Sequence, residues 1–327
     1  MKAILLNDTH SGRHIGCELV IRNTHALCRQ HGIEITHSVK TKEAHQAEAL
    51  IASLLQENDL VLLNGEGTLH DDKSRALSLL KLAKIAKQAG LKTVLYNALW
   101  SNNPIGQQYL PCFDLIFCRD SESANEIRKL HPTLDVQVVP DMIFATQWDE
   151  LSRPRASMAL VTDSVKKKHC YQLAKFAVRN RLPFAPMGTG FHERVNSAYF
   201  LKWRLTRRCH YVHNQLDSAK SFIEKIQASR SVITGRFHTA CLAFLLQTPV
   251  CCISSNTRKI ETLYSDFGLS SDLIGQSISS LAEADAQWQE QVLHRERMNE
   301  KVFDARSEID RMFLLICGLC DETVPIA

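Results

Sequence analysis

The N-terminus has no long hydrophobic run. Its apolar stretch, Ala3-Ile4-Leu5-Leu6, turns polar at Asn7-Asp8. Such a stretch is too short for the apolar region of a secretory signal or for a transmembrane helix. We therefore expect a cytoplasmic protein. Docking at the inner face of the cell membrane stays open, because an anionic surface attracts clusters such as Lys166-Lys167-Lys168, although we favour a solvated helix face for this cluster.

Neither sign of charge is in large excess. The 327 residues include 39 Lys and Arg and 35 Asp and Glu, which leaves a net charge of +4 with neutral histidines. This balance, without a clustered basic stripe, argues against a nucleic-acid partner and favours small anions. The composition, 45% hydrophobic and 23% charged, is that of an ordinary globular protein, and the length allows two domains of about 150 residues each.

The cysteines show no repeated spacing. Eleven are scattered along the chain, and several, such as Cys241, Cys251 and Cys252, lie in apolar runs. We interpret them as reduced core residues, not as a disulfide framework. Cys317 and Cys320 have CxxC spacing but follow an apolar run with no second Cys or His pair nearby, so core packing is favoured over a redox or zinc site.

The signatures of several enzyme classes are missing. The sequence has no HExxH, no P-loop lysine motif and no GxSxG elbow, which leaves metalloprotease, NTPase and α/β-hydrolase functions unsupported. It has no GxGxxG fingerprint, which disfavours a nicotinamide enzyme. His70-Asp71-Asp72 could ligate a metal, but we favour an Asp-rich helix N-terminus. We expect no cofactor and no metal.

Short apolar runs alternate with longer amphipathic segments, which predicts βαβ units and parallel sheets with helices on both faces. The break at 147–155 separates two Rossmann-like α/β domains, 1–150 and 151–327, expected to face a central cleft. Helices after about Ser280 are expected to cross back to the first domain. The predicted strands are 3–6, 33–36, 60–63, 93–96, 115–118, 158–161, 182–185, 231–234 and 250–253, and the predicted helices are near 17–31, 43–57, 72–89, 121–130, 167–180, 194–206 and 217–228, with two more from 236 and 257.

Polar residues follow the predicted strands of the first half, where parallel sheets hold their ligands. Asp8 and His14 follow the first strand, and the run Asn64-Gly65-Glu66-Gly67-Thr68-Leu69-His70 follows the third. The two glycines permit close backbone approach to a ligand, and Glu66 between them is a candidate base for a sugar hydroxyl. A lone GxG is also common in ordinary turns. Arg119 follows the fifth strand.

The strongest signal is Gly235-Arg236-Phe237-His238, which follows a predicted strand and opens an apolar helix. A fixed cation and a titratable imidazole at a helix start suit an anion and a proton transfer. Lys259, after the next strand, is expected to point into the same pocket, and Gly188 belongs to a glycine loop on the same edge. Helix capping by His238 and a surface ion pair of Arg236 are the alternatives.

At these residues the chain resembles the polysaccharide pyruvyl transferase family. The resemblance runs in the family's order from about residue 7 to 268, and each motif is short. The motifs are the runs at 64–70, 119–123, 139–141, 235–238 and 255–261.

This resemblance implies a fold like the GT-B glycosyltransferases, with phosphoenolpyruvate bound by the second domain and a glycan acceptor by the first. It further implies transfer of a pyruvyl unit onto two sugar hydroxyls in the assembly of a capsule or cell-envelope glycan. Arg236 would bind the donor's anionic groups together with His238, Lys259, Gly188 and Arg119, and His238 would be the acid. Glu66 or Asp8 would be the base, and the residues expected to bind the glycan or lipid-linked glycan acceptor are Asp8, His14, Asn64, Gly65 and His70.

The sequence also departs from the family pattern. Where many members have Gly-Asn-x-Gly-Asp after the first strand, this chain has Arg13-His14-Ile15-Gly16-Cys17, and where many have three glycines it has Gly65-Glu66-Gly67. Two alternatives therefore stay open. One is a glycosyltransferase of the same architecture with an activated sugar as donor, and the other is a glycan-binding protein without turnover.

Overall fold

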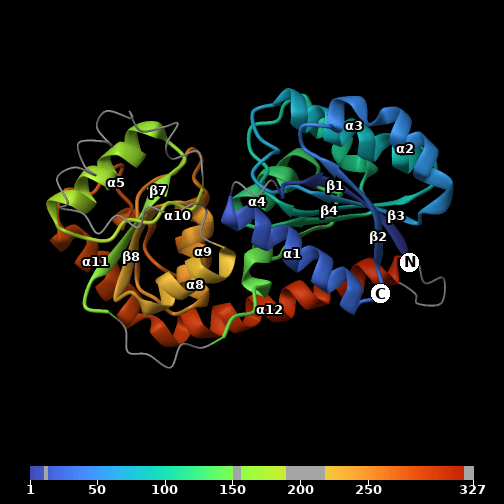
Figure 1. Ribbon diagram of the computed structural model, residues 1–327. Coiled ribbons are helices and arrows are strands. Elements are labelled where there is room, and N and C mark those ends of the chain that lie inside the picture. Colours follow the sequence, from blue (N-terminus) through green and yellow to red (C-terminus); the bar gives the residue numbers. More distant parts are fainter. Residues whose placement is uncertain (11–13, 150–155, 189–217, 320–327) are drawn as a thin grey trace. The chain divides into compact units, whose positions relative to one another are not determined.

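The structure is a computed structural model that describes residues 1–10, 14–149, 156–188 and 218–319 (Figure 1). The chain forms two compact units. Unit 1 comprises Met1–His10, Val20–Ala145 and Ala305–Ala327, and unit 2 comprises Ser11–Leu19 and Thr146–Asp304. The main division thus lies between Ala145 and Thr146, whereas the sequence predicted it after residue 150.

Unit 1 contains a six-stranded parallel sheet in the order β2-β1-β3-β4-β5-β6. The helices predicted between its strands are confirmed, and the short strand β6 was not predicted. The strands are β1 (Lys2–Asp8), β2 (Glu34–Lys40), β3 (Leu60–Asn64), β4 (Lys92–Ala98), β5 (Leu115–Cys118) and β6 (Val136–Val138), and the helices are α1 (Ile15–Gln30), α2 (Glu48–Leu54), α3 (Ser74–Gln88) and α4 (Ser121–Leu130), with 3₁₀ turns at Ala44–Gln46, Leu55–Glu57, Gly106–Cys112 and Met142–Ala145.

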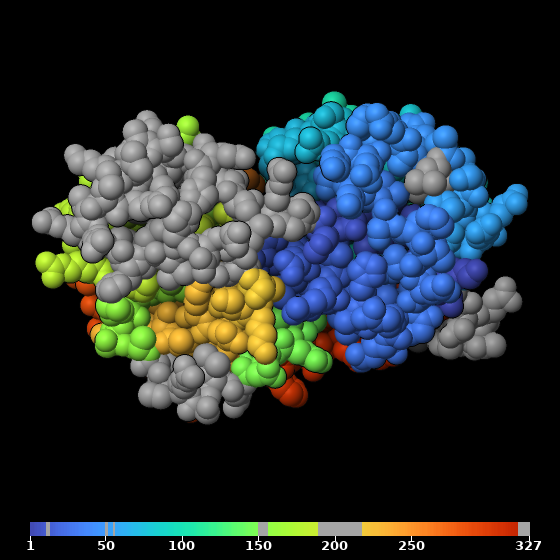
Figure 2. Space-filling model, in the orientation of Figure 1, coloured from blue at the N-terminus to red at the C-terminus, as the bar shows by residue number. Residues whose placement is uncertain are grey.

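Alternating residues of these strands face opposite layers of the core. Ile4, Leu6, Val61 and Leu63 pack with residues of α3 and α4 in one buried cluster, because side chains two apart share one face of a strand. α1 covers the other face, where the hydroxyl groups of Thr24 and Tyr96 are hydrogen-bonded at 3.1 Å. The outer side of α1 forms part of the surface in the space-filling view (Figure 2).

Unit 2 contains a three-stranded parallel sheet in the order β7-β8-β9, extended by a single parallel bridge between Val161 and Phe184. Residues of α5 and α11 pack on one face of this sheet. The predicted helix 194–206 lies outside the described residues. The strands are β7 (Ala159–Ser164), β8 (Ser231–Gly235) and β9 (Val250–Cys252), and the helices are α5 (Lys167–Arg179), α8 (Ala219–Ala228), α9 (Phe237–Leu245), α10 (Lys259–Asp266), α11 (Leu281–Leu293) and α12 (Arg295–Gly318), with a 3₁₀ turn at Ser271–Leu273.

Two helices contribute to both units. The first turn of α1 belongs to unit 2 and its remainder to unit 1, while α12 starts in unit 2 and enters unit 1 at Ala305. Within unit 1, α12 packs on the end of α1, because His31 stacks on Phe313 with ring centroids 5.7 Å apart and binds Asp310 at 2.8 Å. The C-terminal residues from 305 therefore complete the first unit.

None of the cysteines in the described residues forms a disulfide. Six of them, Cys28, Cys118, Cys170, Cys241, Cys251 and Cys252, are buried, as expected for core residues. Cys320 lies outside the described residues, so the CxxC spacing cannot be followed to its second member. Among the described helices, none combines the length and the apolar character that crossing a bilayer requires.

Candidate active site

The carboxyl edge of the unit 2 sheet brings together polar residues from three strands. Asp163 and Ser164 end β7, Arg236 follows β8, and Ser254 follows β9. In a parallel sheet these ends lie on one side, where ligands bind. Gly235 lets β8 approach β7 closely, because a Cβ there would lie 2.6 Å from the Cβ of Ser164.

Arg236 forms a buried ion pair with Asp163. Its Nε donates to Oδ2 of Asp163 at 3.0 Å, and its Nη2 donates to the same oxygen. Asp163 is fully buried, and its Oδ1 accepts the backbone N–H of Met187 at 2.9 Å. Burial lowers the pKa of Arg236, but the charge of Asp163 and the hydrogen bonds to it raise that pKa above its usual value. The guanidinium is therefore a fixed cation.

His238 lies in the first turn of α9 and is only 8% exposed. Its ring meets that of His14 edge to face, with centroids 5.7 Å apart. Gly16 on α1 packs directly against it, since a Cβ at this position would lie 2.4 Å from Nδ1 of His238. The His238 ring can therefore occupy this position only because residue 16 is a glycine.

His14 lies directly before α1. Its Nδ1 accepts the backbone N–H of Cys17 at 3.2 Å, and its Nε2 lies 3.4 Å from Nη1 of Arg236. The chain around His14 is held by a bridge to Gly188 and by a hydrogen bond from the N–H of Ile15 to the carbonyl of Met187. His14 therefore lies in unit 2 beside Arg236 and His238, although the sequence predicted it among acceptor residues of the first domain.

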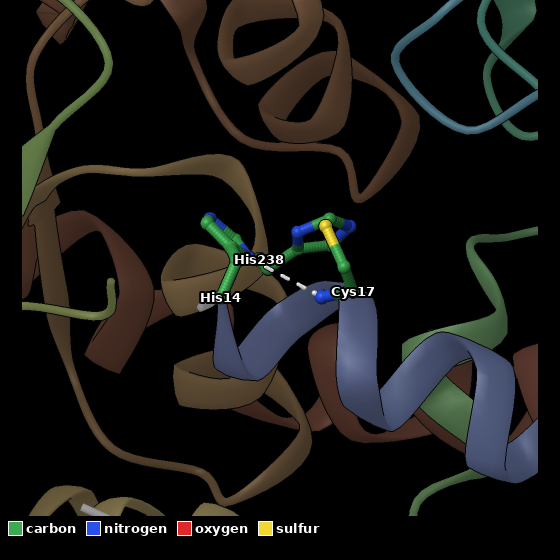
Figure 3. A group of neighbouring side chains, drawn as sticks. All are labelled: His14, Cys17 and His238. Carbon is green, nitrogen blue, oxygen red and sulfur yellow. Dashed lines mark hydrogen bonds between the residues drawn. The ribbon is translucent and has the colours of Figure 1, made fainter. Parts of the chain in front are cut away.

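Figure 3 shows how His14, Cys17 and His238 lie together. The first two come from the start of α1, and the third comes from α9. One ligand atom from each side chain lies within 4.8 Å of the others. Two imidazoles, a thiol and a guanidinium thus form one cluster at the sheet edge.

Lys259 opens α10 on the same edge of the sheet. Its Nζ donates to Oδ1 of Asn256 at 2.8 Å, and the neighbouring Glu261 accepts from the hydroxyl of Ser254 at 2.6 Å. This loop follows β9, as predicted. A contact between Lys259 and a donor stays a prediction.

In unit 1, Glu66 is buried in a polar network after β3. Its Oε2 accepts the hydroxyl of Thr9 at 2.6 Å, and its backbone N–H donates to Oδ1 of Asn64 at 3.2 Å. Gly65 is required by packing, because a Cβ there would lie 2.6 Å from Cα of Ala98. Asp8 is partly exposed at the end of β1 and accepts the N–H of His10 at 2.8 Å.

The run His70-Asp71-Asp72 binds the loop that follows β4. Nδ1 of His70 binds Asp71 at 2.7 Å, and the two oxygens of Asp72 accept the N–H groups of Ile105 and Gly106 at 2.7 and 2.8 Å. The N-cap of α3 is Lys73. The expectation that these aspartates form the start of that helix is therefore wrong, because they bind the loop after β4 instead.

Arg119 lies at the end of β5 in unit 1. Its Nη1 donates to Oδ2 of Asp141 at 3.0 Å, and both side chains are 1% exposed. Asp120 caps α4 by accepting the N–H of Ser123 at 2.8 Å. The described partner of the Arg119 guanidinium is therefore Asp141. A contact between Arg119 and the donor substrate stays a prediction.

The polysaccharide pyruvyl transferase family model matches residues 14–257. The chain belongs to this family. The match spans the first turn of α1, the Arg236 and His238 motif and β9. It therefore covers the cluster of Figure 3 and most of both sheets. No curated protein matches the chain in sequence.

The fold is that of the GT-B class. A UDP-N-acetylglucosamine 2-epimerase from Rickettsia bellii is similar with a TM-score of 0.58 and 11% identity, over 99% of each chain. The UDP-GlcNAc 2-epimerase from Methanocaldococcus jannaschii has a TM-score of 0.54 and 12% identity, over 88% of this chain and 92% of the other. The Neisseria meningitidis UDP-GlcNAc 2-epimerase bound to UDP-GlcNAc has a TM-score of 0.53 and 12% identity, over 96% of this chain and 100% of the other.

Sequence reasoning missed three neighbours of the pyruvyl transferase motif. Asp163 ends a strand whose last residues are the polar run Thr162-Asp163-Ser164, a signal that was available. Gly16 and Cys17 were noted only within a run that departs from the family pattern, and their contact with His238, far along the chain, carries no signal in the sequence.

We expect Gly16→Ala to lower turnover about ten- to a hundredfold, because the added methyl group must displace the ring of His238, the predicted acid, and a shift of about 1 Å at a reacting group costs on this order. The measurement is steady-state phosphate release from phosphoenolpyruvate. Gly318→Ala is the matched control, since a Cβ at Gly318 meets no atom within 4 Å. Equal turnover of Gly16→Ala and wild type would contradict this role of Gly16.

Proposed function

We propose that the protein transfers a pyruvyl group from phosphoenolpyruvate to two hydroxyl groups of a capsule or cell-envelope sugar. The products are a cyclic ketal and phosphate. One observation carries the proposal: Arg236 is held by Asp163 beside His238 and His14 at the carboxyl edge of a parallel sheet. Membership of the polysaccharide pyruvyl transferase family supports the reaction class.

Arg236 suits a donor with a carboxylate and a phosphate group. Two of its nitrogens bind Asp163, which fixes the guanidinium plane, and Nη1 faces His14. A guanidinium so fixed offers directed N–H donors to an oxyanion, and the start of α9 adds a favourable dipole. Gly188, Lys259 and Arg119 are proposed as further donor contacts.

His238 is proposed as the acid. It gives a proton to the methylene carbon of phosphoenolpyruvate, which makes the adjacent carbon electrophilic. One sugar hydroxyl attacks that carbon and loses its proton to a base. The second hydroxyl then attacks the same carbon as the C–O bond to phosphate breaks, and its proton leaves with the phosphate as hydrogen phosphate. Fixed cations stabilise the charge that develops on the leaving group.

Glu66 or Asp8 in unit 1 is proposed as the base for the acceptor. Residue Glu66 is 4% exposed, and its carboxylate accepts a hydrogen bond from Thr9, which keeps the carboxylate oriented as an acceptor of hydroxyl protons. Asn64, Gly65 and His70 surround it in sequence and are proposed to contact the acceptor, a glycan or lipid-linked glycan. For His14, the contacts with unit 2 support a place beside the donor instead.

The test is phosphate release from phosphoenolpyruvate that depends on a glycan acceptor, with the ketal identified by mass spectrometry. A thermal-shift screen precedes it, since a ligand at 100 times its Kd raises stability by about 2.7 kcal/mol. We expect phosphoenolpyruvate to raise Tm and sugar nucleotides to leave it unchanged. A shift by sugar nucleotides alone, with release of a nucleotide, would instead support a glycosyltransferase.

A further inference from the structure

We propose that His14, Cys17 and His238 form a binding site for a divalent transition-metal ion of the zinc class. Imidazole nitrogens and a thiolate are the ligands that zinc prefers, and three protein ligands with an open fourth position are typical of reactive zinc sites. The three ligand atoms lie within 4.8 Å of one another. Metal–ligand bonds of about 2.0–2.3 Å require the three ligand atoms to lie somewhat closer to one another than this. Small side-chain rotations would bring them to that distance.

The ligands come from two helix starts in the same unit. His14 and Cys17 are three residues apart at the beginning of α1, a spacing that puts both side chains on one face (Figure 3). His238 comes from the first turn of α9 and reaches them because Gly16 has no side chain in its way. Sites built on helices hold their ligands more precisely than sites on loops.

The charges near the cluster permit a cation. Among the described residues, Arg236 brings a fixed positive charge to the cluster, with Nη1 3.4 Å from Nε2 of His14. Its charge is balanced by the buried carboxylate of Asp163, which binds Nε and Nη2. Ionised Cys17 adds a negative charge next to the ion, because zinc binds the thiolate and not the thiol.

Both existing contacts of His14 must give way. A neutral imidazole that binds a metal through one nitrogen carries a proton on the other. Both nitrogens of His14 face N–H donors, from Cys17 at 3.2 Å and from Arg236 at 3.4 Å. The ion displaces the donor at one nitrogen, and the proton on the other nitrogen ends the contact with the second donor. Neither distance is short for a hydrogen bond, so two weak interactions are lost.

The ion would also compete with catalysis, an expectation that rests on the proposed function. His238 cannot donate a proton from a nitrogen that ligates a metal. Zinc should therefore inhibit pyruvyl transfer, and removal of zinc by a chelator should restore it. The binding itself requires no turnover, so the site can be tested even if the donor is not phosphoenolpyruvate.

The experiment is titration of the chelator-treated full chain with Co²⁺ alone, followed by displacement with Zn²⁺. We expect a thiolate-to-cobalt absorption band that saturates at one ion per chain. Cys17→Ser should abolish this band and weaken Zn²⁺ binding at least about 100-fold, since loss of an outer partner alone costs about 10–100-fold. His14→Asn should weaken binding similarly while keeping a side chain that caps helices well.

Cys112→Ser is the matched control, because Cys112, like Cys17, is partly exposed and forms no disulfide but lies in unit 1. It should bind both ions as wild type does. The proposal is overturned if the wild type takes up no Co²⁺, or if Cys17→Ser keeps the thiolate band and the Zn²⁺ affinity. Ion binding without phosphate release from phosphoenolpyruvate would leave this site standing and reject the proposed reaction.

Discussion

Arg236→Lys is expected to lower kcat/KM for phosphoenolpyruvate about 10²–10³-fold, the usual cost of losing one well-placed donor to a developing oxyanion. Lysine keeps the positive charge beside Asp163, so the buried carboxylate stays paired. It lacks the planar guanidinium, which binds Asp163 through Nε and Nη2 while Nη1 faces His14. The measurement is initial-rate phosphate release over a range of phosphoenolpyruvate concentrations.

Arg230→Lys is the control for this variant. Arg230 is exposed and lies immediately before β8, at the amino end of the strand that Arg236 follows. It should retain wild-type rates. A value of kcat/KM for Arg236→Lys within a factor of three of wild type would show that the guanidinium fork does not bind the donor.

His238→Gln is expected to lower kcat about 10²–10⁴-fold, the range for loss of a general acid. Glutamine has a similar reach but cannot donate a proton to carbon at neutral pH. Binding of phosphoenolpyruvate should persist, because Arg236 and Asp163 are unchanged, so the thermal shift with donor should remain. A fall in kcat without loss of the shift separates proton transfer from binding.

His31→Gln provides the matched control, since His31 is also a largely buried histidine. His31 lies in unit 1, where it pairs with Asp310, and its side chain is 9% exposed. Its kcat should equal that of the wild type. If His238→Gln turned over as fast as His31→Gln, another group would have to supply the proton, and the acid role of His238 would be wrong.

Much of the fold was predictable from the sequence. The strands of both units are short apolar runs between helices. For β1, β3 and β4 the predicted bounds lie within two residues of the observed bounds at both ends. β6 was missed because three residues, Val136–Val138, are too few for a periodic pattern. The Asp71 and Asp72 turn was misread because its partners, Ile105 and Gly106, lie in another loop.

The sequence by itself determined the alternation of strands and helices, the family, and the placement of Arg236 and His238 after a strand. These are local properties, since periodicity and motif order can be read within a few residues. Only the tertiary structure decided that His14 belongs with Arg236, 222 positions later in the chain, and that Asp163 fixes the guanidinium. Such contacts depend on how closely backbones pack, as at Gly16, and no local pattern encodes that distance.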